Sequence, residues 1–223
     1  MNQKTAAPIK ESLVHAFKRD NYWVYPALVA VAIILLGLMY KHLGFFDKAL
    51  LALIGAIPAG AKPLMQGLTA AATAPAIFAI AIIFIGYLFF VKRLRSAYIL
   101  IGALISQVLL YEILGQIFRR VRPSGVDVVA YGVHSSSFPS GHAASSAVVF
   151  LVITYLINKH ASRVVSRTLM ALATIFVVAV AVSRVYLGFH YPTDVLGGWL
   201  VALLVFLVAK RIADVRVTDT TPD

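Results

Sequence analysis

Long apolar runs, separated by short polar and basic segments, cover most of this 223-residue chain. Most of these runs approach the ~20 residues that an α-helix needs to cross the hydrocarbon core of a bilayer. We therefore expect an all-α fold, a six-helix transmembrane bundle. Its six spans are predicted over residues 22–40, 73–91, 97–118, 143–158, 168–186 and 195–210.

A further apolar stretch, residues 46–66, is interrupted by Pro58, Gly60, Lys62 and Pro63. Proline cannot donate a backbone hydrogen bond, and irregular backbone at membrane depth is tolerated only where protein or water satisfies its polar groups. The pattern therefore favours an interfacial helix or a re-entrant segment over a seventh span.

Hydrophobic residues make up 61% of the chain and charged residues only 13%, which is typical of an integral membrane protein. The formal net charge of +11 raises the question of nucleic-acid binding. However, the basic residues gather where apolar runs end rather than along one helix face, so the predicted partner is the membrane bilayer and not a nucleic acid. The chain has no cysteine, which excludes disulfides and thiolate metal sites.

The distribution of Lys and Arg predicts the orientation of the bundle. Thirteen of the twenty lie on the side of the two termini, and seven lie on the opposite side. The positive-inside rule then places an interfacial N-terminal segment, residues 1–21, and a tail, residues 211–223, in the cytoplasm. Between them, residues 22–210 are predicted to form a single multi-pass domain in the cell membrane, either an inner or a plasma membrane.

Three short polar segments interrupt the apolar pattern on the side opposite the termini. They are Arg122-Pro123, Pro139-Ser140-Gly141-His142, and Ser183-Arg184 followed by His190 and Asp194. Polar residues without a common role would be spread over both sides of the membrane. Their convergence predicts one active site at the extracytoplasmic membrane boundary.

This pattern resembles the type 2 phosphatidic acid phosphatase (PAP2) superfamily, which includes membrane lipid phosphatases and soluble vanadium haloperoxidases. The second motif of the family, Pro-Ser-Gly-His, is complete at residues 139–142, and the third, Ser-Arg with a following His and Asp, is complete at residues 183–194. The first motif, a Lys and then Arg-Pro after six residues, keeps Arg122 and Pro123 but has Gly115 at the lysine position.

The resemblance assigns Arg122, Ser140, Gly141 and Arg184 to phosphate binding, and their chemistry suits that role. The two guanidinium groups are permanently charged planar forks that match phosphate oxygens. The serine hydroxyl can donate a hydrogen bond, and glycine lets a backbone N–H approach without a side chain in the way. The predicted start of a helix beside them adds a helix N-terminus, which favours an anion.

The resemblance also implies a phosphohistidine mechanism without metal or cofactor. His190 is the predicted nucleophile, and Asp194 is predicted to accept a hydrogen bond from one nitrogen of its ring. His142 is predicted to protonate the leaving group and then to activate the water that resolves the intermediate. The carboxylates are too few and too dispersed for a two-metal site. The other histidines are predicted to be surface or interfacial residues, namely His15, His42, His134 and His160.

Gly115 removes one positive donor from the expected phosphate site. Arg119 and Arg120 follow four and five residues later, and a guanidinium reaches further than an ammonium group, so Arg120 is the favoured substitute. The alternatives are a weaker hold on phosphate or a different substrate. Glu112, an ionisable residue inside a predicted span, is expected to pair with one of these arginines.

The predicted function is hydrolysis of the terminal phosphate of a lipid phosphate or pyrophosphate. The family implies polyprenyl pyrophosphate, phosphatidylglycerophosphate or phosphatidic acid as the substrate, and the motif spacing does not choose among them. Three alternatives stay open: a phosphotransferase that uses the same intermediate, a vanadate-dependent peroxidase, and a non-catalytic transporter or lipid-binding protein. The missing lysine disfavours the second, and the complete histidine pair argues against the third.

Overall fold

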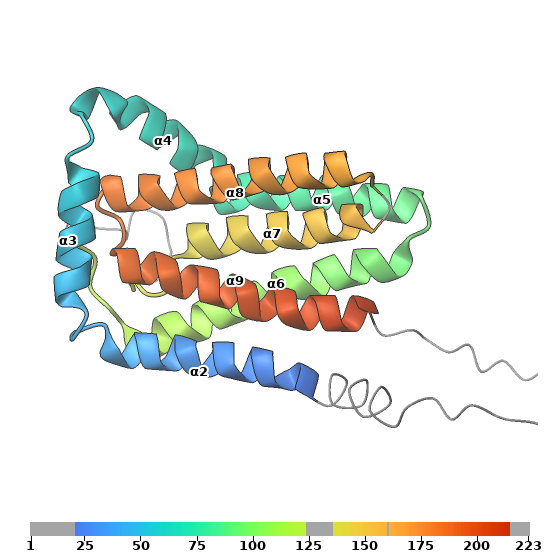
Figure 1. The fold of residues 1–223 in the computed structure, drawn as a ribbon, viewed down its shortest axis with the longest axis horizontal. Coiled ribbons are helices and arrows are strands. Elements are labelled where there is room, and N and C mark those ends of the chain that lie inside the picture. The colour runs from blue at the N-terminus through green and yellow to red at the C-terminus, as the bar shows by residue number, and fades with distance from the viewer. Residues whose placement is uncertain (1–20, 124–135, 160, 215–223) are drawn as a thin grey trace, which may run out of the picture.

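Helices account for almost all of the chain that the computed structural model describes, residues 21–123, 136–159 and 161–214 (Figure 1). Within these residues no strand occurs. The helices are α2 (Val24–Met39), α3 (Gly44–Gly55), α4 (Lys62–Ala71), α5 (Ala74–Phe90), α6 (Leu94–Phe118), α7 (Gly141–Asn158), α8 (Arg163–Tyr186) and α9 (Pro192–Asp214), with 3-10 turns at Asn21–Trp23 and Ala59–Ala61.

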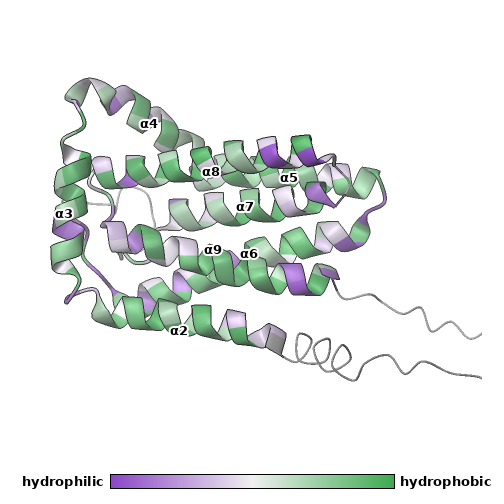
Figure 2. Ribbon diagram, in the orientation of Figure 1, coloured by the Kyte–Doolittle hydropathy of each residue, from purple (hydrophilic) through white to green (hydrophobic). Residues whose placement is uncertain are grey.

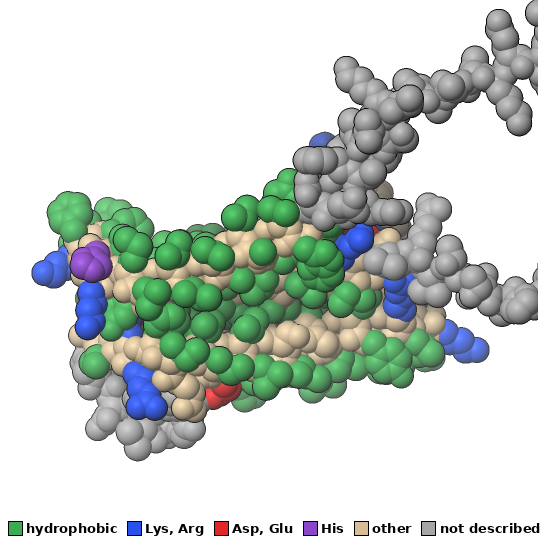
Figure 3. Space-filling view, turned by 90° about the horizontal axis from the view of Figure 1, so that it is seen from below, with side chains coloured by type: hydrophobic (Ala, Val, Ile, Leu, Met, Phe, Trp, Pro, Cys, Tyr) green, Lys and Arg blue, Asp and Glu red, His purple; other side chains and the backbone are tan. Residues whose placement is uncertain are grey.

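The predicted all-α membrane bundle is confirmed. In the described residues, α6, α7, α8 and α9 are each long and apolar enough to cross a membrane, and the number rises to six if each of two bent helix pairs is one span. Figure 2 shows helices that are mostly hydrophobic along their length, with hydrophilic residues mainly towards the two ends of the bundle. In Figure 3, hydrophobic side chains cover the middle of the molecule, and Lys and Arg lie at both ends.

The helix α3 follows α2 after a short turn and is bent by 88° from it. It therefore crosses one end of the bundle, at the left of Figure 1, instead of continuing through it. This course agrees with the interfacial or re-entrant segment predicted for residues 46–66. Asp47 on α3 is nevertheless buried, with only 2% of its surface exposed, which shows that this helix presses against the bundle.

The helix α7 is the most buried of the spanning helices and packs against α6, α8 and α9. Its first turns carry small residues, Ala143, Ala144, Ser145, Ser146 and Ala147, all of which are buried. Small side chains let helix backbones approach closely inside a membrane, where van der Waals packing holds helices together. The sequence of α7 therefore places it at the centre of the bundle.

Two adjacent glycines on α9 bring it against the residues that precede α7. A Cβ atom added to Gly197 would lie 2.4 Å from the Phe138 ring, and one added to Gly198 would lie 2.6 Å from the carbonyl oxygen of Ser140. Neither distance is compatible with a real side chain. The glycine pair thus fixes how closely the N-terminus of α9 approaches the turn that carries the Pro-Ser-Gly-His motif.

Candidate active site

The three predicted motifs meet at the end of the bundle that α3 crosses. Arg122 lies just after α6, Ser140 directly precedes α7, and Arg184 belongs to the last turn of α8. His190 lies in the turn between α8 and α9, and Asp194 lies in the first turn of α9. The ends of four helices therefore surround one polar site.

Ser140 is the N-cap residue of α7. A serine in this position usually accepts a hydrogen bond from the first turn of the helix, but this side chain makes no capping bond, and its Oγ is buried without a partner among the described residues. The backbone N–H of Ser140 donates to the carbonyl oxygen of Asp194 at 2.9 Å, which fixes the turn against α9. The hydroxyl and the free N–H groups of the first turn are therefore placed to hold an anion.

Gly141 and His142 form the first turn of α7. A Cβ atom at Gly141 would lie 3.0 Å from the ring of Tyr111 on α6, so the absence of a side chain permits this close packing. His142 is half-buried. On the neighbouring helix, Arg184 is buried, and its guanidinium carbon lies 4.2 Å from the centroid of the Phe189 ring. That contact orients the guanidinium.

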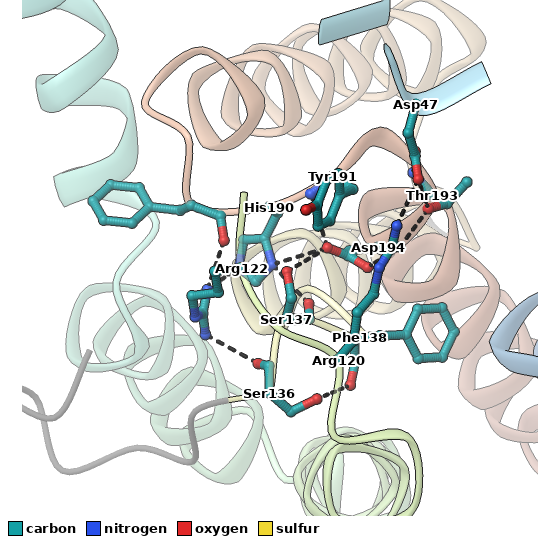
Figure 4. A network of polar contacts seen from close by, with 11 residues as sticks. Asp47, Arg120, Arg122, Ser136, Ser137, Phe138, His190, Tyr191, Thr193 and Asp194 are labelled. Carbon is teal, nitrogen blue, oxygen red and sulfur yellow. Dashed lines mark hydrogen bonds and ion pairs between the residues drawn. The ribbon is translucent and has the colours of Figure 1, made fainter. Parts of the chain in front are cut away.

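Arg122 and His190 are in direct contact (Figure 4). Arg122 Nη1 lies 3.1 Å from Nε2 of His190 and donates to the carbonyl of Phe189 at 2.8 Å, while Nη2 donates to the carbonyl of Ser136 at 3.1 Å. On the other side of the ring, Nδ1 lies 2.8 Å from the carbonyl oxygen of Ser137. Because arginine can only donate, Nε2 is the unprotonated nitrogen and Nδ1 carries the proton.

The environment of His190 keeps its ring neutral. Burial lowers the pKa of His190 well below its ordinary value of 6.5, and the charges of Arg184 and Arg122 lower it further. The hydrogen bond to the Ser137 carbonyl acts in the opposite direction. A neutral ring keeps a lone pair on Nε2, which a nucleophile requires and which here accepts the hydrogen bond from Arg122.

Asp194 holds the histidine less directly than the sequence predicts. Its Oδ2 lies 3.9 Å from Nδ1 of His190, beyond hydrogen-bond distance, because the Ser137 carbonyl occupies the acceptor position. Oδ2 instead accepts from the Ser137 hydroxyl at 2.5 Å and from the backbone N–H of Tyr191 at 2.8 Å. Asp194 therefore fixes the segment whose carbonyl orients the ring.

Arg120 lies on the far side of Asp194 from the histidine (Figure 4). Its Nη1 donates to Asp194 Oδ1 and to Thr193 Oγ1, both at 2.6 Å, and its Nη2 donates to Asp47 Oδ2 at 2.6 Å. Its guanidinium also stacks against two tyrosine rings. The structure thus gives Arg120 two carboxylate partners, where the sequence predicted a contact with phosphate in place of the missing lysine.

Sequence reasoning missed Asp47 and Ser137. Asp47 Oδ1 accepts from the backbone N–H of Thr193 at 2.9 Å, and its Oδ2 accepts from the Thr193 hydroxyl at 2.8 Å as well as from Arg120. The sequence offered one indication of Asp47, which is the only carboxylate in the apolar stretch of residues 46–66. That stretch was expected to lie at the membrane interface on the side of the motif arginines. Ser137 gave no such signal, because it precedes the motif and acts partly through its backbone.

Two further predicted features lie in or near α6. Gly115, at the lysine position of the family motif, is buried, and Glu112 lies half-buried one turn before it. The predicted pairing of Glu112 with an arginine stays a prediction.

His42 is exposed in the turn between α2 and α3, as predicted. Three other predicted surface residues lie outside the described residues, namely His15, His134 and His160.

Three of the donors at this site lack partners among the described residues. Ser140 Oγ, Arg122 Nε and Arg184 Nε are buried without a hydrogen-bond partner among the described residues. Buried polar groups are normally paired, so unpaired donors at one site indicate an acceptor-rich ligand. In the described part of the chain, no three His, Asp, Glu or Cys residues are grouped as metal ligands would be. Positive charge and hydrogen-bond donors thus dominate the site, as phosphate binding requires.

Comparison with known proteins identifies the family. Residues 96–217 match the family model of the PAP2 superfamily. Phosphatidylglycerophosphatase B of Bacillus subtilis is 33% identical over 66% of this chain and 72% of its own length. Undecaprenyl-diphosphatase of Sulfolobus acidocaldarius is 29% identical over 54% of this chain and 57% of its own length.

Two solved structures resemble most of this chain. The crystal structure of a transmembrane PAP2 type phosphatidylglycerolphosphate phosphatase from Bacillus subtilis superposes with a TM-score of 0.73 at 28% identity, over 85% of this chain and 96% of that one. LpxE of Aquifex aeolicus shares the fold with a TM-score of 0.58 at 21% identity, over 74% and 94%. This chain is a multi-pass membrane protein and belongs to the PAP2 superfamily.

Proposed function

We propose that this protein is a membrane lipid phosphatase that hydrolyses the terminal phosphate of a lipid phosphate or pyrophosphate through a phosphohistidine on His190. One observation carries the proposal: Nε2 of His190 is unprotonated and lies 3.1 Å from Nη1 of Arg122. A phosphate that takes over this hydrogen bond from Arg122 would therefore lie against the lone pair of the nucleophile. Membership of the PAP2 superfamily and the names of the relatives support the same reaction.

In the first step, Nε2 attacks phosphorus and the bond between phosphorus and the lipid oxygen breaks. The lipid leaves as an alcohol, or as a monophosphate from a pyrophosphate, after taking a proton from His142. Arg122 and Arg184, with Ser140 and the first N–H groups of α7, stabilise the charge on the equatorial phosphate oxygens. The Ser137 carbonyl holds the proton on Nδ1, so Nε2 remains the reacting atom.

In the second step, water attacks the phosphohistidine and gives up a proton to His142. Inorganic phosphate leaves, and both histidines return to their starting states. Asp194 acts through Ser137 and the Tyr191 N–H rather than on the ring itself. Arg120 is proposed as a positioning residue that holds Asp194, and not as a ligand of the phosphate.

A lipid substrate suits the interior of the bundle beyond the site. A cavity of about 510 Å³ lies between α7, α8 and α9, and its lining is mainly apolar, including Ala147, Val177 and Phe206. It begins at Ala147, five residues after His142, and extends along α7 to Asn158 at the opposite end of that helix. A cavity of this size and lining can take part of an acyl or prenyl chain. The relatives are named for phosphatidylglycerophosphate and undecaprenyl diphosphate, so lipids of these two kinds and phosphatidic acid are the proposed substrates.

The proposed orientation follows from the basic residues. The positive-inside rule puts both termini in the cytoplasm and the active site on the extracytoplasmic side. A cell membrane, either inner or plasma, is then the proposed location. The substrate headgroup would be reached from the outer leaflet.

The experiment is phosphate release from these three lipids by the purified full-length chain, with a chelator present. The wild type is compared with His190→Ala and with His42→Ala, an exposed histidine at the same end of the bundle. We expect turnover by the wild type and the His42 variant and none by the His190 variant. Activity that needs added metal, or that survives His190→Ala, would contradict the mechanism. Transfer of labelled phosphate to a second lipid, without free phosphate, would indicate a phosphotransferase instead.

A further inference from the structure

A second cavity, of about 360 Å³, lies at the same end of the bundle as the active site. It is bordered by the turn after α2, the first turn of α3, the residues after α6, and Tyr191. Its lining includes the basic residues Lys41, Lys48 and Arg119. The mechanism above uses none of these three side chains, so their position needs a separate explanation.

Arg120 forms one wall of this cavity but has little charge to offer a ligand. Its guanidinium carbon lies 4.5 Å from the centroid of the Tyr40 ring and 4.0 Å from that of Tyr191, so it is stacked between them. Its terminal nitrogens bind Asp47 and Asp194, both at 2.6 Å. The charge of Arg120 is therefore compensated inside the protein, and any ligand must be recognised by the other basic groups.

Lys41, Lys48 and Arg119 are exposed, and none of them forms a salt bridge within the described ranges. Arg119 is held in the left-handed conformation, with φ at 42°, and its Nε donates to the carbonyl of Gln116 at 3.0 Å. The four basic side chains around the cavity face two carboxylates, Asp47 and, behind Arg120, Asp194. Two positive charges are therefore in excess, which favours an anion.

The distribution of basic residues over the whole chain agrees with this excess. The end of the bundle that bears the motifs carries only seven Lys and Arg, against thirteen on the side of the termini. Two of the seven, Arg122 and Arg184, belong to the active site. Four others line the second cavity, and only Lys62 lies outside both. Basic residues are disfavoured on the extracytoplasmic side, so their concentration at the active site and around this cavity favours an anionic ligand at each place.

We propose that this cavity binds a second phosphate group, distinct from the one that is cleaved. Ammonium and guanidinium groups around a cavity with tyrosine walls suit the phosphodiester of an anionic phospholipid headgroup, and free phosphate has the same chemistry. Tyr191 connects the two sites, because its ring lines the cavity and its backbone N–H donates to Asp194 at 2.8 Å. Tyr191 would therefore lie between the bound phosphate and the proposed catalytic residues.

The test measures binding without turnover, so it does not depend on the proposed phosphatase activity. Full-length His190→Ala protein in neutral detergent is titrated with phosphatidylglycerol, with phosphatidylcholine and with sodium phosphate, and bound molecules are counted by native mass spectrometry. The Lys41→Gln/Lys48→Gln variant should bind phosphatidylglycerol roughly tenfold more weakly than the parent, because two charges close to the phosphate are lost. Phosphatidylcholine binding should not change.

The matched control is Lys62→Gln, which removes an exposed lysine at the same end but outside the cavity. It should bind phosphatidylglycerol as the parent does. If sodium phosphate alone shows the dependence on Lys41 and Lys48, the site stands and its ligand is free phosphate. If neither ligand depends on these lysines, or if Lys62→Gln weakens binding equally, the proposal is wrong. If the wild-type protein shows no phosphatase activity, the proposed function is wrong, but the result of this binding experiment is unaffected.

Discussion

The role of Arg120 can be tested by a double-mutant cycle with Asp47. Arg120 joins two buried carboxylates, so Arg120→Leu leaves both of them without a cation, and we expect it to cost about 3–5 kcal/mol of stability. Asp47→Leu removes the acceptor of three hydrogen bonds from Thr193 and Arg120 and should cost a similar amount. In the double variant the uncompensated charge from Asp47 is gone, so the two costs should not add. We expect a coupling free energy of about 2 kcal/mol.

Two readouts separate positioning from phosphate binding. Chemical denaturation in mixed micelles gives the free energies of unfolding for the cycle, and steady-state hydrolysis of a short-chain phosphatidic acid gives kcat and KM. A positioning residue should lower kcat with little change in KM, because Asp194 and through it His190 lose their fixed geometry. If Arg120→Leu raises KM at unchanged kcat and stability, and if the two substitutions add within about 0.5 kcal/mol, the reasoning is refuted and Arg120 contacts the phosphate.

Three other predictions follow from the site and its surroundings. Because burial lowers the pKa of His190, its ring stays neutral as the pH falls through 6.5. Phosphohistidine formation in single-turnover experiments should therefore persist below pH 6.5. If it were lost with a midpoint at pH 6.5, the pKa of His190 would not be lowered. Gly198→Ala should remove most activity, because the new Cβ would meet the Ser140 carbonyl at 2.6 Å, and unimpaired turnover would show that α9 can shift freely. Ala173→Phe, which fills the apolar cavity, should slow the hydrolysis of long-chain lipids more than that of short-chain lipids. The control is Ala171→Phe, at an exposed position of the same helix. Equal effects of the two substitutions would exclude this cavity as a binding site for the lipid chain.

Much of the fold was predictable because it depends on patterns that are local in the sequence. The apolar runs predicted the spanning helices, and the Pro, Gly and Lys residues after Ile57 mark the break between α3 and α4. The convergence of Arg122, Ser140 and His190 at one end of the bundle was also predictable, because the order of spans alone decides on which side each motif emerges.

The partners of Asp194 were not predictable, because they depend on packing between distant segments. Asp47 and Thr193 are 146 positions apart, and the predicted interfacial segment did not indicate which residue of α3 would face the start of α9. The same applies to the histidine: the spacing of His190 and Asp194 suggested a direct bond, while the Ser137 carbonyl takes that place. Arg120 was noticed for its charge, but its carboxylate partners became visible only in three dimensions.

The position of Asp47 also limits how the chain can be truncated without loss of the polar network around Arg120. The match to the family model begins at residue 96, and every motif residue lies within it. The buried carboxylate that pairs with Arg120 lies 49 positions before that boundary, on a helix that the motifs do not mark. A fragment or a chimera joined at residue 96 would carry all the recognisable residues and lose this counterion. The boundary of the family match is therefore not the boundary of the buried polar network, which includes Asp47 on α3.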